Sequence, residues 1–202
     1  MRREHAMTLL QRGKMRIGTL LGYRDVGQHG TAIGDSDEGV KSLHLDGTGE
    51  RWDASSIPEF AKAFFNLGPK ASLQLDGIRL VMPQQSPDYY LFCASEVADP
   101  VAMAEFGYNA CVVIERPDRF FPAISHALRH VGVLEAVERC QYLPRSTPHH
   151  QDHGVHPALL KEPAYAYQKE VRALWRPIGG PPRPRFIECR KAAKWCSPGL
   201  GL

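Results

Sequence analysis

The sequence predicts a single domain of the α+β class, built on a mostly antiparallel sheet with flanking helices. The chain has 202 residues, of which 43% are hydrophobic and 23% are charged, which is enough for one sizeable core. Short runs that alternate hydrophobic and polar residues follow one another through brief turns. Segments of helical periodicity lie between them without regular alternation, which argues against a parallel α/β sheet.

The first expected elements are a helix at residues 3–12 and a strand after it. In the helix the apolar side chains share one face, and Gly13 is a typical C-terminal cap. The next expected elements are strands at 15–24 and 40–47, separated by an acidic turn at 34–39.

A helix is expected at residues 56–68, where apolar residues recur at helical spacing and Pro58 falls in the first turn. Asp76 and Gly77 then separate two alternating runs within residues 71–82. An Asp-Gly pair in this position predicts a hairpin of two short antiparallel strands.

The rest of the chain is expected to add strands, two helices and a loop. Dense apolar runs favour central strands, and a stretch without apolar periodicity favours an exposed loop. The expected strands lie at 89–95, 110–115, 136–143, 165–175 and 186–190, the helices at 100–107 and 116–132, and the loop at 144–157. We expect the tail from about residue 191 to fray.

The strand at 165–175 places polar residues at every second position. Because strand side chains alternate between faces, the core face is expected to hold Tyr165, Tyr167, Val171, Ala173 and Trp175. The opposite face is expected to hold Gln168, Glu170 and Arg172. This polar face is either a solvated surface with cross-strand ion pairs or part of a site.

Three pieces of the chain together resemble the arginine–serine–glutamate branch of the ADP-ribosyltransferase superfamily. In the family's order they are MRIGTLLGYR at 15–24, YLFCAS at 90–95 and YQKE at 167–170. The middle piece ends in Cys93-Ala94-Ser95, where the family has Ser-Thr-Ser. The resemblance implies a split, mostly antiparallel sheet and NAD as a substrate, cleaved between nicotinamide and ribose.

The resemblance also implies the roles of six residues. Glu170 would stabilise the oxocarbenium-like transition state, and Gln168 would orient the acceptor. A guanidinium suits the pyrophosphate, with Arg16 as the first choice and Arg24 as the second. Ser95 would support either Glu170 or the nicotinamide ribose, and Tyr23 would stack on the nicotinamide ring.

The chain is also similar to a set of uncharacterised bacterial proteins that share a domain of unknown function. The shared features are the early strand, the acidic turn from Asp35 to Gly39, the middle strand, and a late pattern K-x-x-x-Y-x-Y-x-x-E-x-R from Lys161 to Arg172. This similarity covers about residues 5 to 176. It implies no particular reaction.

Two other classes of function stay open. The acidic turn or the His-rich loop from His149 to His156 would supply ligands in a metal-dependent nuclease or hydrolase, although their spacing matches no defined metal motif, so we expect no metal. In a non-catalytic binding module, Glu170 and Arg172 would merely pair across the sheet.

Composition bears on location and partners. The five cysteines form no CxxC pair, and the N-terminus has the pattern of neither a signal peptide nor a membrane span, which favours a cytoplasmic protein without membrane contact. A net charge of +3 does not by itself indicate nucleic-acid binding. The expected acceptor is a macromolecule, either a protein or a nucleic acid. The resemblance to ADP-ribosyltransferases is consistent with a bacterial toxin or phage-defence effector, which would act with or without a regulatory partner.

Overall fold

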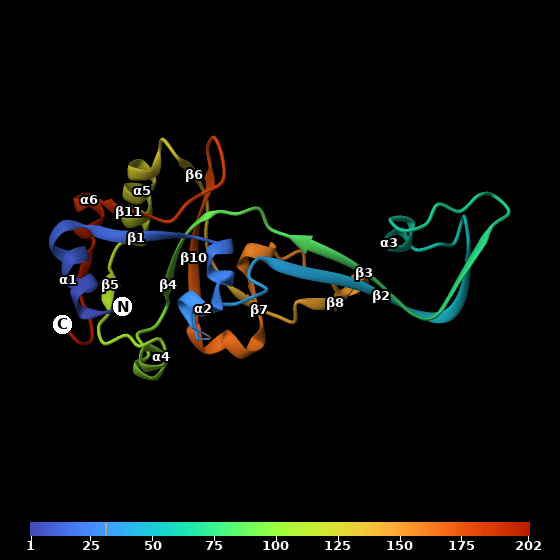
Figure 1. Ribbon diagram of the computed structural model, residues 1–202, viewed down its shortest axis with the longest axis horizontal. Helices are drawn as coiled ribbons and strands as arrows, with labels where there is room; N and C mark the ends of the chain where they lie inside the picture. Colours follow the sequence, from blue (N-terminus) through green and yellow to red (C-terminus); the bar gives the residue numbers. More distant parts are fainter. Residues whose placement is uncertain (31) are drawn as a thin grey trace.

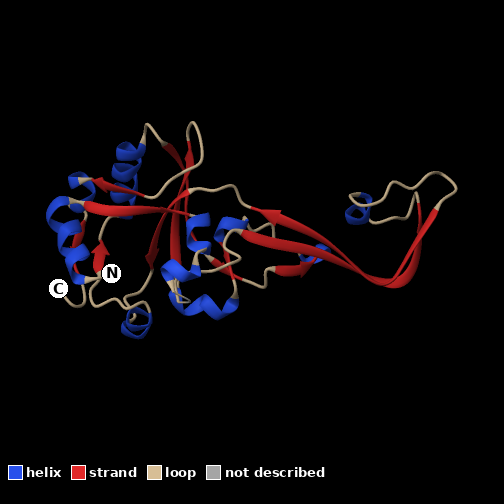
Figure 2. Ribbon diagram, in the orientation of Figure 1, coloured by secondary structure: helices blue, strands red, loops and turns tan. Residues whose placement is uncertain are grey.

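The computed structural model describes residues 1–30 and 32–202. It is a mixed α and β structure with mostly antiparallel sheets, as the sequence predicts. A long two-stranded arm projects from a body that contains both chain termini (Figure 1). The helices gather around the body, and the arm consists largely of strand (Figure 2).

A five-stranded sheet in the body carries the candidate site. Its order is β11-β1-β4-β10-β6, and every neighbouring pair is antiparallel. These strands are β1 (Lys14–Thr19), β4 (Tyr90–Ser95), β6 (Gly132–Arg139), β10 (Glu170–Pro177) and β11 (Arg185–Glu188). The two strands that hold the candidate catalytic and serine residues, β10 and β4, are therefore direct neighbours.

The body also contains helices. They are α1 (Arg3–Arg12), α2 (Val26–His29), α4 (Pro100–Glu105), α5 (Pro117–Leu128) and α6 (Arg190–Ala193). Of these, α1, α5 and α6 pack against one face of this sheet. The predicted helix at 3–12 is confirmed, and its cap Gly13 has the left-handed φ of 72°. The main core lies between α5, α6 and the sheet, and it includes Phe120, Ile124 and Trp175.

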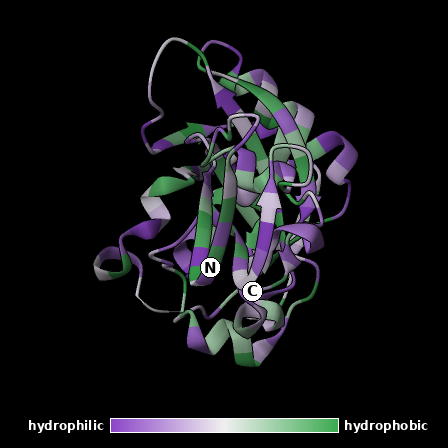
Figure 3. Cartoon of the chain, turned by 90° about the vertical axis from the view of Figure 1, so that its right-hand side faces the viewer, coloured by the Kyte–Doolittle hydropathy of each residue, from purple (hydrophilic) through white to green (hydrophobic). Residues whose placement is uncertain are grey.

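The arm is formed by β2 (Val40–Asp53) and β3 (Ser72–Gln85), with β8 (Ser146–Pro148) parallel to β2 near the body. Its outer part has a small core of its own around Trp52, Ile57, Ala61, Leu75 and Leu80. The helix predicted at 56–68 is reduced to one turn, α3 (Glu59–Lys62). Viewed along the arm, hydrophobic and hydrophilic residues alternate along the strands (Figure 3).

The hairpin predicted at Asp76 and Gly77 is wrong. The backbone continues through both residues within β3, although Gly77 has a positive φ of 64°. The register with β2 shifts here, between Asp46 and Thr48. The Asp-Gly pair therefore forms a β-bulge. A bulge, like a turn, needs a residue that can adopt a positive φ, but the strand continues beyond it.

Two further expectations differ from the structure. Tyr165 and Tyr167 do not share a strand face with Trp175, because η4 (Pro163–Gln168) is a 3₁₀ helix and β10 begins only at Glu170. The early strand likewise ends at Thr19, and η1 (Leu21–Arg24) follows as a 3₁₀ helix. Consequently Tyr23 does not lie on a strand.

The remaining short elements lie partly in predicted strands and partly in segments that the sequence predicts to be a loop or a frayed tail. They are β5 (Val112–Ile114), which pairs with β12 (Cys196–Pro198), β7 (Gln141–Tyr142), which pairs with β9 (Leu160–Lys161), and the 3₁₀ helices η2 (His149–Gln151) and η3 (Pro157–Leu159). The tail beyond residue 191 is thus anchored by a strand rather than frayed. The expected loop at 144–157 contains β8, and its Arg145 is buried.

Candidate functional site

One pocket of the body brings together four of the six predicted site residues. It has a volume of about 670 Å³, which is in the range of small-molecule sites. Its walls include Tyr23 from η1, Ser95 from β4, Gln168 from η4 and Glu170 from β10. The antiparallel register sets Ser95 directly opposite Glu170, which explains why residues 75 positions apart meet.

Glu170 is held on both sides by cations. Its Oε1 accepts a hydrogen bond of 2.8 Å from Arg172 Nε, and its Oε2 accepts one of 2.7 Å from Lys161 Nζ. Arg172 lies on the same face of β10 because it is two residues further along the strand. The polar face of the strand is therefore a buried ion-pair network and not a solvated surface.

Arg172 connects this network to the acidic turn. Its two terminal nitrogens donate to the two carboxylate oxygens of Glu38 at 2.7 and 2.8 Å, the two-pronged geometry that suits a guanidinium. One of them also donates to the carbonyl of Ala158 at 2.5 Å. Both ionic side chains are 1% exposed, so the pair ties the segment after η1 firmly to β10.

The electrostatics of the network keep Glu170 ionised. Burial alone would raise the pKa of this carboxyl, but the charges of Arg172 and Lys161 outweigh burial and hold the pKa far below its ordinary value. Burial would likewise lower the pKa of Lys161, and the carboxylate of Glu170 raises it instead. The pocket thus contains a carboxylate whose charge is compensated by its neighbours.

Gln168 and Ser95 are engaged in holding the pocket together. The Gln168 amide donates to the carbonyl of Ala32 at 3.0 Å and accepts from Lys161 Nζ at 2.5 Å. The hydroxyl of Ser95 donates to the backbone carbonyl of Gln168 at 2.8 Å. Ser95 therefore fixes the turn before Glu170, and its hydroxyl is not bonded to the Glu170 carboxylate.

Cys93 also lies near Glu170, two residues before Ser95 on β4. It pairs with Arg172 across β4 and β10, and the negative charge of Glu170 acts on it. Its side chain is exposed and forms part of the pocket wall. Burial among protein atoms raises the pKa of the thiol well above its usual range, so Cys93 is a neutral thiol at pH 7.

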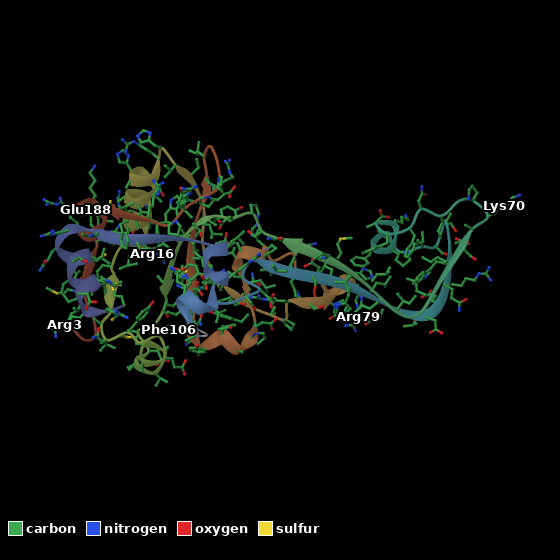
Figure 4. All side chains as sticks on the ribbon, viewed as in Figure 1. Arg3, Arg16, Lys70, Arg79, Phe106 and Glu188 are labelled. Carbon is green, nitrogen blue, oxygen red and sulfur yellow. The ribbon has the colours of Figure 1, made fainter. Side chains whose placement is uncertain are left out.

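Neither candidate arginine lies on the pocket wall. Arg16 is exposed on β1, in the body as labelled in Figure 4, and its charge opposes the effect of burial on the pKa of Tyr23. Arg24 is half-buried, and its Nε donates to the carbonyl of Glu38 at 2.8 Å. Because Arg24 is committed to the backbone of the acidic turn, Arg16 is the better placed of the two to meet a ligand.

Aromatic side chains line the pocket on the α4 side. Phe106, labelled in Figure 4, and Tyr108 have ring centroids 5.6 Å apart, and both lie on the pocket wall with Tyr23. The ring of Tyr167 stacks on the ring of Phe106, with 6.3 Å between the two ring centroids. Burial raises the pKa of Tyr23, so its hydroxyl is neutral and available as a hydrogen-bond donor.

The acidic turn and the His-rich loop have other roles than metal binding in this structure. Asp35 forms a two-pronged ion pair with Arg145 and accepts a hydrogen bond from the amide of Asp37, as in an Asx-type turn. Asp152 pairs with Lys41 at 2.9 Å. Among residues 1–30 and 32–202, no three His, Cys, Asp or Glu side chains are grouped to share a metal ion.

Sequence reasoning anticipated the pair of Glu170 and Arg172 only as part of the binding-module alternative, and it missed the roles of Lys161 and Glu38. Lys161, Arg172 and Glu38 all lie in the two segments singled out by their sequence pattern, Asp35 to Gly39 and Lys161 to Arg172. The structure joins these two motifs through the pair of Glu38 and Arg172. Arg145, which pairs with Asp35, belongs to neither of these motifs, so the sequence gave no indication of its role.

The comparisons with known proteins give no further support for any assignment. No family model matches the chain, and neither a curated protein nor a solved structure matches it. In the part of the chain that the structure describes, no helix has the length and hydropathy needed to cross a bilayer.

Proposed function

We propose that this chain is an ADP-ribosyltransferase-like enzyme that uses NAD as a substrate and modifies a macromolecular acceptor or hydrolyses NAD. The observation that carries the proposal is the convergence of Tyr23, Ser95, Gln168 and Glu170 on one pocket from three distant segments. The five cysteines are all unpaired, in keeping with a reducing cytoplasm. A role as a toxin or phage-defence effector is part of the same proposal.

In this proposal the bond between C1′ of the ribose and the nicotinamide nitrogen breaks, and its electron pair leaves with nicotinamide. The acceptor nucleophile, or water, forms the new bond at C1′ and gives up a proton. Glu170 would accept a hydrogen bond from the ribose and stabilise the positive charge that develops. A carboxylate has about four acceptor positions, of which Arg172 and Lys161 occupy two, so capacity for this contact remains.

The structure adds two conditions to this mechanism. The cations beside Glu170 offset its charge, so the carboxylate would act by hydrogen bonding and position more than by net charge. Gln168 would contribute by holding Lys161 and the segment at Ala32, because its amide is already engaged.

The test is the release of nicotinamide from NAD by purified protein mixed with cell lysate. The proposal predicts release by the wild type and none by Glu170→Gln, with Glu135→Gln, an exposed carboxylate on β6, as the matched control that keeps activity. Glu170→Gln leaves the buried Lys161 without its carboxylate partner and removes one of the two carboxylates that pair with Arg172, so its fold is checked by circular dichroism.

A second variant keeps the test decisive if Glu170→Gln does not fold. Ser95→Trp places a bulky ring at the pocket wall without removing any member of the ion-pair network. It should abolish nicotinamide release while the protein stays folded. Absence of release by the wild type, or full release by folded Ser95→Trp, would show that the pocket does not process NAD.

The second candidate is a non-catalytic binding module, and the ion pairs favour it. Glu170 and Arg172 are paired and almost completely buried, which is what a purely structural role requires. In that case the same pocket holds a small molecule without changing it. Binding of NAD without release of nicotinamide under any acceptor condition would distinguish this candidate.

A further inference from the structure

We infer that the groove between α5 and α6 binds the phosphate backbone of a nucleic acid. This surface is separate from the pocket, and the inference does not depend on NAD chemistry. The two helices pack against each other and leave an open groove of about 540 Å³ between them. Its wall residues are Asp118, Arg119, Pro122, Ala123 and His126 on one side, and Lys191, Lys194 and Trp195 on the other.

The segments that form the groove and flank it carry an excess of positive charge. Residues 115–130 and 185–195 contain seven Lys or Arg against three Asp or Glu, an excess of four positive charges. The whole chain has an excess of only three, so the remainder is slightly negative. The mild overall charge thus conceals a local concentration of positive charge, which is the electrostatic signature of polyanion binding.

The cations on the α6 side are available to a ligand. In the ranges 1–30 and 32–202, the ion pairs that involve the groove are those of Asp118 with Arg116 and Arg119. Lys191 and Lys194 are exposed and have no carboxylate within ion-pairing distance there. Phosphate oxygens can therefore approach them without first displacing a protein partner.

The surroundings of the groove favour a nucleic acid over a membrane. Trp195 is half-buried on the groove wall, and an aromatic side chain in a basic groove is the kind of group on which nucleic-acid bases stack. Within the described residues, no large hydrophobic side chain of α5 or α6 is exposed for insertion into lipid. The groove is also located in the body, on the side away from the tip of the arm (Figure 1).

The test is fluorescence anisotropy with labelled oligonucleotides of about 20 nucleotides, single-stranded and duplex, at about 50 mM salt and without NAD. The test variant is Lys191→Glu with Lys194→Glu. The matched control is Lys62→Glu with Lys70→Glu, which makes the same charge change on the arm, where Figure 4 places Lys70 at the far tip.

The wild type should bind at least one of the oligonucleotides, and binding should weaken steeply as salt rises. The groove variant should bind at least about tenfold more weakly and lose about two from the slope of log affinity against log salt. The arm variant should stay within about threefold of the wild type. Circular dichroism checks that each variant is folded.

Three outcomes would overturn the inference. One is the absence of oligonucleotide binding by the wild type. Another is equal weakening by the groove and arm variants, which would mean that overall charge and not the groove is responsible. The third is binding to vesicles of phosphatidylserine and phosphatidylcholine with none to oligonucleotides. Because no NAD is present, these outcomes are separate from any failure of the proposed enzyme activity.

Discussion

Replacement of the buried Arg172 should destabilise the protein more than any single substitution of an exposed residue. Arg172→Met keeps the volume of the side chain but leaves the buried carboxylates of Glu38 and Glu170 without their shared cation. Removal of one partner from a buried ion pair costs about 3–5 kcal/mol. For a chain of this size, that corresponds to a fall in Tm of about 6–20 °C.

The assay is thermal unfolding followed by circular dichroism, with urea unfolding to obtain the free energy. The matched control is Arg176→Met, on the same strand, whose ion pair with Glu135 is exposed and should contribute about 0–1 kcal/mol at most. The added substitutions Glu38→Gln and Glu170→Gln should restore part of the loss, because they remove the unpaired charges. A loss below about 1 kcal/mol for Arg172→Met would refute the network as a structural tie.

Three other predictions concern pH, backbone geometry and thiol reactivity. The pKa of Glu170 in the folded protein is below its ordinary value of 4.5, so the stability that its ionised carboxylate contributes is present above pH 4.5 and is lost as the pH falls. The urea midpoint of the wild type should therefore approach that of Glu170→Gln between about pH 5 and 3. A difference between the two midpoints that widens over this range would contradict the prediction. Gly13→Ala should lower the free energy of unfolding by at least about 1 kcal/mol, because Gly13 has a φ of 72° and the new Cβ would lie 2.2 Å from the carbonyl oxygen of Cys189. The control Gly68→Ala, whose new Cβ would have no neighbour within 4 Å, should change Tm little. Cys93 should react with iodoacetamide more slowly than free cysteine at pH 8, because burial raises its thiol pKa, and equal rates in peptide mapping by mass spectrometry would disprove that.

Local sequence signals predicted the elements whose conformation depends on near neighbours in the chain. The helix at 3–12 ends at Gly13 because the cap requires only residues of that helix. The helices at α4 and α5 were also predicted, and both begin with a proline in the first turn. In each case the signal and the structure lie within a few residues of each other.

The same signals failed where tertiary pairing decided the outcome. Asp76 and Gly77 carry the strongest hairpin signal, yet β2 supplies a partner on both sides of them, and the strand continues as a bulge. The alternation in 165–175 was taken to begin at Tyr165, whereas the chain forms a 3₁₀ turn until Gln168. Periodicity cannot report where pairing with β4 begins.

The sequence predicted four of the residues that line the pocket, but not the ion pairs that surround Glu170 or the absence of Arg16 and Arg24 from the pocket wall. Glu170 and Ser95 were expected to meet, and the antiparallel register brings them together. That Glu170 is bound by Arg172 and Lys161, and Arg172 in turn by Glu38, depends on contacts that span up to 134 residues. The pair of Glu170 and Arg172 follows from strand alternation, whereas no local pattern encodes the contact of Arg172 with Glu38.

The most direct test of the central claim is calorimetric titration of NAD into the purified protein. If the pocket between β4, η1 and β10 holds NAD, the wild type should bind with a Kd in the range of about 1 μM to 1 mM that is usual for enzyme substrates. Folded Ser95→Trp should show no binding heat. Absence of heat with the wild type, or unchanged affinity in the Trp variant, would contradict the account.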